Sequence, residues 1–214
     1  MIFSKFIDIT LPLHPGFPVW PGDPPPVIEQ IHQIADGHPY NSTRWQCSLH
    51  WGTHIDAPYH LIQSGWSIDQ IPLHILLGKV QVVEVPDVPV ITHTILEKYK
   101  LTPIDRIIFK TRNSAFWDEN PLRFHTDFTA LDGKAAEMLL ERGVKLVGID
   151  YLSLDLFNAK NLPVHNILYR NNVIGVEGLD LRKVTAGYYD LICLPLKVLK
   201  ADGAPARVLL VPEN

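Results

Sequence analysis

The segment from His50 to His60, HWGTHIDAPYH, holds the densest group of side chains in this chain that could do chemistry. Its three histidines and one aspartate (His50, His54, Asp56 and His60) all lie at even positions. Because successive side chains of an extended strand point to opposite faces, this spacing predicts that the four share one face. Imidazole and carboxylate together suit Zn, Mn, Fe or Ni, and zinc is the most common of these. The segment therefore predicts a metal site.

A helical conformation fits this segment poorly. Asp56 would lie about 200° around a helix from His54, and Pro58 would break a helix interior. In an extended conformation Gly52 shares the face of His50 and His54, and its missing side chain leaves space for a cation between the two imidazoles. The alternative, in which polar residues gather on a surface by chance and bind nothing, is disfavoured by the regular spacing.

The same segment resembles the HxGTHxDxPxH signature of the metal-dependent cyclase family, whose best-known members are bacterial kynurenine formamidases and the related isatin hydrolases. The resemblance covers most of the chain and includes the segments DIT, WPGD, VGID, VEGLDL and DGAPARVLL. It implies one α/β domain over residues 1–214, with a mixed sheet that resembles the three-layer swivelling β/β/α fold. One departure is Tyr151-Leu152-Ser153, where the formamidases tend towards TPS. That segment is expected to border the pocket, so the departure bears on the substrate and not on the metal site.

His165 and Glu177 are weak candidates when each is considered alone. A single histidine on a short helix is more often an ordinary polar residue than a ligand. Glu177, however, stands inside the apolar stretch VIGVEGL, where a buried charge is costly unless it is paired or bound to metal. In the formamidases a histidine and, twelve residues later, a glutamate complete the metal site, and PVHNILYRNNVIGVEGLDL has this spacing.

The resemblance therefore implies a complete ligand set. His50 and His54 would be terminal ligands of one ion, Asp56 and Glu177 would bridge, and His165 would bind a second ion. The implied cofactor is two zinc ions, with manganese as the alternative.

His60 remains free for proton transfer in this arrangement. Bound zinc can lower the pKa of water to about 7 and polarise a carbonyl group, and an imidazole can take a proton from the nucleophile and return it to the leaving nitrogen. The resemblance thus implies an amidohydrolase of small aryl formamides, with N-formylkynurenine, a compound of tryptophan catabolism, as the first substrate to test. Opening of a cyclic amide or lactone such as isatin is the second candidate. A binding protein without turnover and a purely structural metal domain are disfavoured by the spare histidine.

Trp20 lies on a proline-dense segment, VWPGDPPP, which can form turns and polyproline II but not a central strand. The residues alone leave two possibilities open, a tryptophan anchored in the core or one wall of a pocket. The resemblance implies that Trp20 contacts substrate, because the formamidases have a tryptophan in a similar WPGD segment.

Local patterns predict the elements that must position these residues. Strands are expected at 2–10, 42–50, 78–85, 105–111, 144–150, 173–179 and 207–212. Helices are expected at 92–100, with Thr92 or Thr94 as cap, at 132–142, closed by Gly143, and around His165, with Asn161 as cap and Pro163 in the first turn. The segment 113–121 is an expected loop that either covers the site or connects two elements.

Composition limits the class of protein. The 214 residues, 46% of them hydrophobic, suffice for one domain with a sizeable core, and no apolar stretch is long enough to span a bilayer. A net charge of −4, with 19 scattered Lys and Arg residues, predicts no nucleic-acid partner. The N-terminus does not resemble a secretion signal, since Lys5 and Asp8 interrupt its apolar residues, so a cytoplasmic location is expected.

The two cysteines are too few for a disulfide framework, so both are expected as thiols, and Cys47 is expected in the core rather than among the ligands. The family resemblance implies a small-molecule substrate and a homodimer or a higher homo-oligomer.

Overall fold

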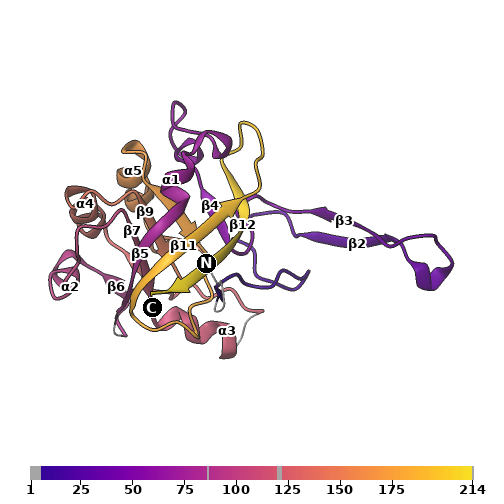
Figure 1. Ribbon diagram of the computed structural model, residues 1–214, viewed down its shortest axis with the longest axis horizontal. Helices are drawn as coiled ribbons and strands as arrows, with labels where there is room; N and C mark the ends of the chain where they lie inside the picture. The colour runs from indigo at the N-terminus through magenta and orange to yellow at the C-terminus, as the bar shows by residue number, and fades with distance from the viewer. Residues whose placement is uncertain (1–5, 86, 120–121, 214) are drawn as a thin grey trace.

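Eight strands form the main sheet of the computed structural model, which describes residues 6–85, 87–119 and 122–213 (Figure 1). In spatial order they are β1 (Ile7–Asp8), β12 (Gly203–Pro212), β11 (Gly187–Pro195), β5 (Leu77–Glu84), β7 (Arg106–Lys110), β9 (Leu146–Ile149), β10 (Ile174–Glu177) and β4 (His54–Asp56). Strands β5, β7, β9 and β10 run parallel, and the other pairings are antiparallel. The predicted α/β domain with a mixed sheet is therefore confirmed.

The sheet closes on itself, which the sequence did not predict. β4 pairs with β10 on one side and with β12 on the other, so seven strands form a ring and β1 lies outside it. Side chains from strands all around the ring, among them Ile55, Val82, Ile108 and Val208, pack into one buried cluster. Alternate residues of the parallel strands, such as Ile107 and Val147, face a second cluster shared with the helices. These strands read as continuous apolar runs because both of their faces are buried.

The described residues form five short α-helices: α1 (Leu73–Leu76), α2 (His93–Leu96), α3 (Phe116–Glu119), α4 (Gly133–Glu141) and α5 (Pro163–Arg170). Single 3₁₀ turns add η1 (Ile34–Asp36), η2 (Pro58–His60), η3 (Ile68–Gln70) and η4 (Arg112–Ala115). A small parallel pair joins β6 (Val90–Ile91) to β8 (Ala130–Leu131). No helix within the described ranges combines the length and the apolar character that crossing a bilayer requires.

Local capping signals were predicted correctly for α4 and α2. Asp132 accepts a hydrogen bond from the Ala135 backbone N–H at 2.7 Å, and Gly143 ends α4 with a φ of 80°. Thr92 caps α2 in the same way. For α5 the prediction of Asn161 as the cap is wrong: Leu162 is the N-cap residue and its side chain makes no capping bond. Asp155 caps α5 instead. Its side chain accepts a hydrogen bond from the backbone N–H of the second residue of the helix, nine residues further along the chain.

Several predicted boundaries are also wrong. Within the described residues, the strand expected at 2–10 is limited to β1, and residues 2–5 of that prediction lie outside the described part of the chain. The strand expected at 42–50 ends at Gln46, and β11 was not predicted at all. The segment 113–121 forms η4 and α3 up to Glu119, with residues 120–121 outside the described part of the chain. Trp117 of that segment is buried and stacks on Tyr151, so the segment connects elements rather than covering the site.

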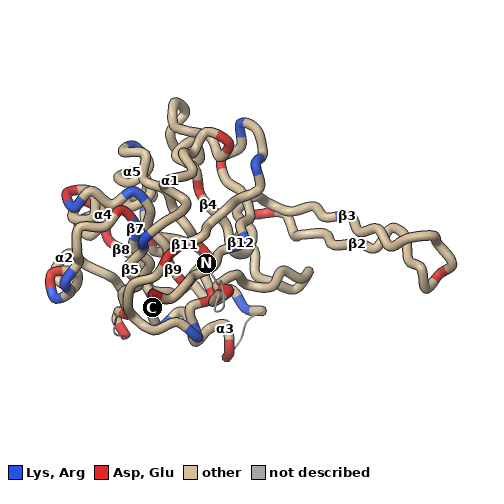
Figure 2. The backbone as a smooth tube through the Cα atoms, viewed as in Figure 1, with Lys and Arg blue, Asp and Glu red and all other residues tan. Residues whose placement is uncertain are grey.

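A two-stranded hairpin stands away from the body of the molecule (Figure 1). Among the residues that the structure describes, its strands β2 (Val27–His32) and β3 (Ser42–Gln46) pair only with each other. Ile28 and Trp45 are cross-strand neighbours on one face and Glu29 and Arg44 form an ion pair on the other, yet all four are exposed. Figure 2 shows that most of the hairpin is uncharged. An isolated hairpin is at best marginally stable in water. This exposed apolar arm (residues 27–46) therefore gains little stability from its own two strands.

Two glycines with left-handed backbone cross where the ring closes. Gly52 has a φ of 74° and Gly178 a φ of 68°. A Cβ added to Gly178 would collide with the carbonyl oxygen of Gly52. Thr53 fastens the crossing, since its hydroxyl donates to the Gly178 carbonyl and accepts from the Leu11 backbone N–H. Close approach of the two backbones therefore requires glycine at 178.

Gly178→Ala is expected to lower the free energy of unfolding by about 2 to 4 kcal/mol, because it adds a steric collision to the cost of left-handed backbone. Gly143→Ala is the matched control, since Gly143 has a φ of 80° and open space around its Cβ position. The control should lose about 1 to 2 kcal/mol. Urea unfolding measures both, and equal losses in the two variants would show that the crossing tolerates a side chain.

Candidate metal centre

The segment from His50 to His60 is a strand only at β4, so the prediction that all four side chains share one strand face is wrong for His50 and His60. His50 lies in a turn, Gly52 turns the chain into β4, and Pro58 begins the 3₁₀ turn η2. Only His54 and Asp56 share a strand face as predicted. The reason is local: left-handed backbone at Gly52 and the fixed φ of Pro58 end the extended conformation on either side.

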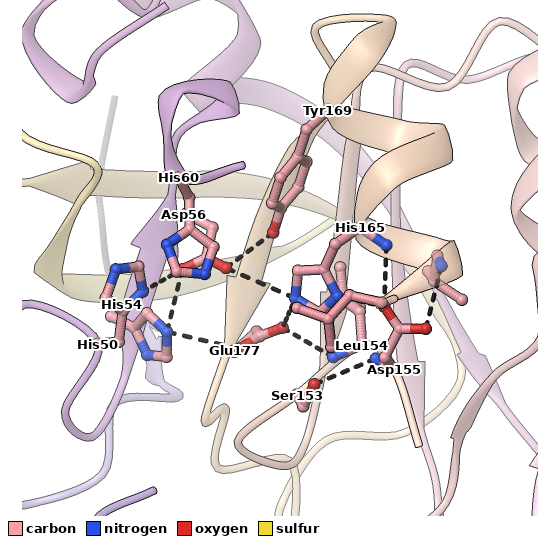
Figure 3. A network of polar contacts seen from close by, with 12 residues as sticks. His50, His54, Asp56, His60, Ser153, Leu154, Asp155, His165, Tyr169 and Glu177 are labelled. Carbon is pink, nitrogen blue, oxygen red and sulfur yellow. Dashed lines mark hydrogen bonds and ion pairs between the residues drawn. The ribbon is translucent and has the colours of Figure 1, made fainter. Parts of the chain in front are cut away.

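The four side chains nevertheless converge (Figure 3). His50 Nδ1 lies 2.7 Å from Asp56 Oδ1, and His54 Nε2 lies 3.2 Å from the same oxygen. The half-buried His60 ring lies beside that of His50, with ring centroids 4.2 Å apart. The curve of the chain thus brings the predicted residues together by a different path from the one expected.

His165 and Glu177 complete the cluster from the opposite side. The pairing of β10 with β4 sets Glu177 opposite His54, and Glu177 Oε2 lies 3.5 Å from His54 Nε2. The ring of His165, on α5, places Nε2 3.1 Å from Glu177 Oε1 and 3.6 Å from Asp56 Oδ2. Each of the two carboxylates therefore faces imidazoles on both sides, the arrangement expected of bridging ligands.

The donors fit a metal ion by their burial. His54, Asp56, His165 and Glu177 are each at most 4% exposed. His54 Nε2 is buried without a hydrogen-bond partner among the described residues, although two carboxylate oxygens lie within 3.5 Å of it. A buried polar atom rarely lacks a partner. A buried nitrogen aimed between two carboxylates therefore fits the role of a metal ligand.

The charges of the cluster lead to the same conclusion. Burial alone lowers the pKa of an imidazole, but the surrounding carboxylates outweigh it and raise the pKa of His50 to about 11, of His54 to about 9 and of His165 to about 10. Burial and the neighbouring Asp56 raise the pKa of Glu177, but His165 and His54 overcome both and hold it at about 2. The buried carboxylates thus require positive charge, and a divalent cation could replace the protons on the imidazoles.

Three further residues hold the cluster in place, and the sequence reasoning missed all of them. The second nitrogen of each imidazole has a partner: His54 Nδ1 the Gly52 carbonyl at 2.9 Å, His165 Nδ1 Asp155 at 2.5 Å, and His50 Nε2 Asp202 at 2.8 Å. Metal-binding histidines are ordinarily fixed in this way. The hydroxyl of Tyr169 donates to Asp56 Oδ2 at 2.8 Å.

One of these residues had a usable signal. Tyr169 is four residues after His165 on a helix, hence on the same face. Asp202 stands in the DGAPARVLL segment, which supported the family resemblance without receiving a role. Asp155 and Asp202 have no local pattern that separates them from ordinary surface aspartates.

A cavity of about 400 Å³ opens above the cluster, within the size range of small-molecule sites. Trp20, Leu152 and Leu162 contribute apolar side chains to it, and His60 and Asp202 polar ones. The Trp20 ring lies edge-on to Phe124, with centroids 5.3 Å apart. Both sequence interpretations of Trp20 therefore hold, because it packs on an aromatic cluster and also lines the cavity.

The segment that departs from the formamidases, Tyr151 to Ser153, lies where it was expected. Leu152 and Ser153 line the cavity. Tyr151 is buried behind them, and its hydroxyl accepts a hydrogen bond from the His125 backbone N–H at 2.6 Å.

Within the described residues, three groups of donors are close enough to hold an ion. They are His50, His54 and Asp56; Asp56, His165 and Glu177; and His50, His60 and Asp202. The first two share Asp56 and are buried, apart from His50, whose side chain is 18% exposed. The third lies at the cavity surface, where Asp202 is 42% exposed. The two cysteines take no part: both are free thiols, with Cys193 buried and Cys47 partly buried against the aromatic cluster.

Comparison with known proteins gives consistent matches. A family model described as "Putative cyclase" matches residues 7–156. A kynurenine formamidase of Bacillus anthracis is 32% identical over 209 residues, which cover 98% of both chains. The solved structure of a potential metal-dependent hydrolase with cyclase activity is 33% identical, with a TM-score of 0.84 over 98% of this chain and 99% of the other. Isatin hydrolase A from Labrenzia aggregata is 25% identical, with a TM-score of 0.83 over 98% and 94%.

His54→Ala is expected to weaken zinc binding at least tenfold, because it removes the buried nitrogen that faces both carboxylates and loss of a ligand should exceed the loss of a supporting residue. Equilibrium dialysis followed by elemental analysis measures the bound zinc. His93→Ala, on the exposed face of α2, is the control and should match the parent. If His54→Ala binds as much zinc as the control does, the cluster does not hold the ion.

Proposed function

This chain belongs to the cyclase family, and on that premise we propose that it is a metal-dependent hydrolase of carbon–nitrogen bonds other than peptide bonds. The observation that carries the proposal is the cluster of three imidazoles around two buried carboxylates at the floor of a cavity with an aromatic wall. A purely structural metal site would be closed. This cluster instead opens to a cavity that is also lined by His60, which belongs to neither of the two donor groups that share Asp56.

The proposed substrate is a small aryl formamide, with N-formylkynurenine as the first compound to test. The kynurenine formamidase of Bacillus anthracis, which is similar over nearly the whole chain, supports this choice. A cyclic amide such as isatin is the second candidate, supported by the similarity to isatin hydrolase A, and lactones are a related possibility.

We propose two zinc ions, with manganese as the alternative, as the cofactor. His50 and His54 would bind one ion, His165 would bind the other, and Asp56 and Glu177 would be shared. Bound ions of this kind lower the pKa of water and polarise a carbonyl group. The support is the chemistry of the donors and the unpartnered His54 Nε2.

The chain itself would supply orientation and proton transfer. Trp20 offers a flat apolar surface for an aryl ring, and Leu152 and Leu162 add apolar side chains to the cavity lining. His60 borders both the cavity and the cluster, so it can accept a proton as the nucleophile attacks and return it to the nitrogen that leaves. We therefore assign His60 the role of general base and then general acid.

We also propose that the protein acts in the cytoplasm as a homodimer or a higher homo-oligomer. The exposed apolar arm supports assembly, since Ile31 is 50% exposed and Trp45 43%, and an unsupported hairpin gains stability when another surface covers it. Sedimentation equilibrium measures the mass, and the mass of one chain at micromolar concentration would exclude the assembly.

A panel of aryl formamides, isatin-type rings and lactones, assayed with the zinc-loaded enzyme, tests the proposed reaction. Release of formate from an aryl formamide is the expected result. The absence of turnover across the panel, with zinc bound, would exclude the proposal.

Trp20→Ala should weaken binding of an aryl formamide by about 1 to 3 kcal/mol, or about 5- to 150-fold in KM, because substrate loses its aromatic contact. An alkyl formamide is the matched control substrate and should change less, and Trp20→Phe should restore most of the loss. An unchanged KM for the aryl substrate in a folded variant would confine Trp20 to packing.

His60→Ala should keep its zinc and lose about 100- to 10,000-fold in kcat, the usual contribution of a general acid–base group. Zinc content and rate must be measured on the same sample, with His93→Ala as the control. A variant that has lost zinc would make His60 a ligand, and one with full zinc and the parental rate would remove His60 from the mechanism.

A further inference from the structure

Asp202 contacts two parts of the site, the ligand cluster through His50 and the histidine at the cavity, His60. Its Oδ2 atom lies 2.8 Å from His50 Nε2 and 3.4 Å from His60 Nδ1. The three residues come from separate segments: the turn before β4, the turn η2, and the residue just before β12. We propose that Asp202 is a positioning residue that sets the orientation of both His50 and His60.

The backbone holds Asp202 firmly at this place. The Ala57 backbone N–H donates to the Asp202 carbonyl at 2.9 Å, and the Ile68 backbone N–H donates to the Ala201 carbonyl at 2.9 Å. Gly203 follows and pairs with Asp56 across β12 and β4. The side chain of Asp202 is 42% exposed, but these bonds fix the backbone that carries it beside the cluster.

Gly203 also allows the ring of His50 to lie close to this strand. A Cβ at position 203 would be 2.8 Å from His50 Cε1 and 2.8 Å from the Ile55 carbonyl oxygen. Separations below 3.0 Å are not tolerated there without movement, so any other residue would push the ring away. The Asp202–Gly203 pair thus combines a carboxylate that holds the imidazole with a backbone that leaves space for it.

For His50 the consequence is a defined tautomer. Nδ1 faces Asp56 at 2.7 Å, inside the donor cluster, and Nε2 faces Asp202. When Nε2 carries the hydrogen and donates it to Asp202, the lone pair of Nδ1 remains available to an ion in the cluster. A carboxylate behind a ligating histidine also makes that histidine a better electron donor.

For His60 the consequence is a preferred ring direction. With Nδ1 turned towards Asp202, Nε2 is the nitrogen left for exchange of a proton with substrate. The 3.4 Å separation is longer than a typical hydrogen bond, so Asp202 guides this ring less firmly than that of His50. One oxygen of Asp202 therefore contacts both His50, a proposed metal ligand, and His60, the proposed proton carrier.

This proposal rests on the proposed function for its kinetic part only. Asp202→Asn keeps the shape of the side chain and removes its charge, and Asp202→Ala removes the contact altogether. Asp190→Asn, an exposed aspartate of β11 that pairs with Lys79, is the matched control. Zinc affinity is measured by competition with a chelator, and the tautomers of His50 and His60 by ¹⁵N NMR of the zinc-loaded protein.

Asp202→Ala should weaken zinc binding about 10- to 100-fold without reducing the number of ions at saturation, as loss of an outer carboxylate does, and Asp202→Asn should lie between it and the parent. The ring ¹⁵N shifts of His50 and His60 should move in both variants and stay unchanged in Asp190→Asn. Unmoved shifts and parental zinc affinity would overturn the proposal. The loss of one ion per chain at saturation would also overturn it, because Asp202 would then be a ligand.

The kinetic test is a double-mutant cycle with an aryl formamide. Asp202→Asn should lower kcat about 10- to 100-fold, with little change in KM, in the parent. In the His60→Ala background the same change should cost less, because the part that acts through His60 is already lost. An equal loss in both backgrounds would overturn the link to His60. If the parent turns over no amide, the proposed function fails, and the zinc and NMR measurements still decide the position of Asp202.

Discussion

Two carboxylates buried side by side are the constraint on which the rest of this site depends. Asp56 and Glu177 enter from neighbouring antiparallel strands, β4 and β10, at the place where the ring of strands closes. Neither is more than 3% exposed, and like charges at such a depth repel strongly. Three imidazoles surround them, and further groups hold those imidazoles in turn. The geometry of the region follows from the need to compensate this buried negative charge.

Trp20 gives the cavity lining an aromatic part as well. Phe124 and Phe157 support this ring, since the three pack against one another with centroids 5.3 to 5.6 Å apart, and Tyr151 lies 6.0 Å from Phe124. A charged floor and an aromatic wall favour a substrate that is flat and apolar at one end and polar at the other. Trp20 and the donor cluster come from different segments of the chain.

Local patterns in the sequence predicted the local features well. The caps of α2 and α4 and the apolar strands β7 and β9 each depend on neighbouring residues, and the alternation of His54 and Asp56 is that of a strand. His165 and Glu177 were weak candidates until the family resemblance connected them to the motif. Asp202 was missed because its partner His50 is 152 residues away in the chain, and Asp155 because it caps a helix in place of the nearer Asn161. The closed ring could not be predicted for the same reason, since its closing pairs, such as Ile55 with Ala204, lie far apart in the chain.

Strand β4 links ion binding to the stability of the whole domain. This strand has three residues, closes the ring through pairings on both of its edges, and carries His54 and Asp56. An ion held there would bind the folded chain and not the unfolded one, so it would add RT ln(1 + [M]/Kd) to the folding free energy, about 2.7 kcal/mol when the free ion is at 100 times Kd. The supply of metal in the cell would then control how much folded protein persists, and starvation for the ion would remove the protein as well as its activity.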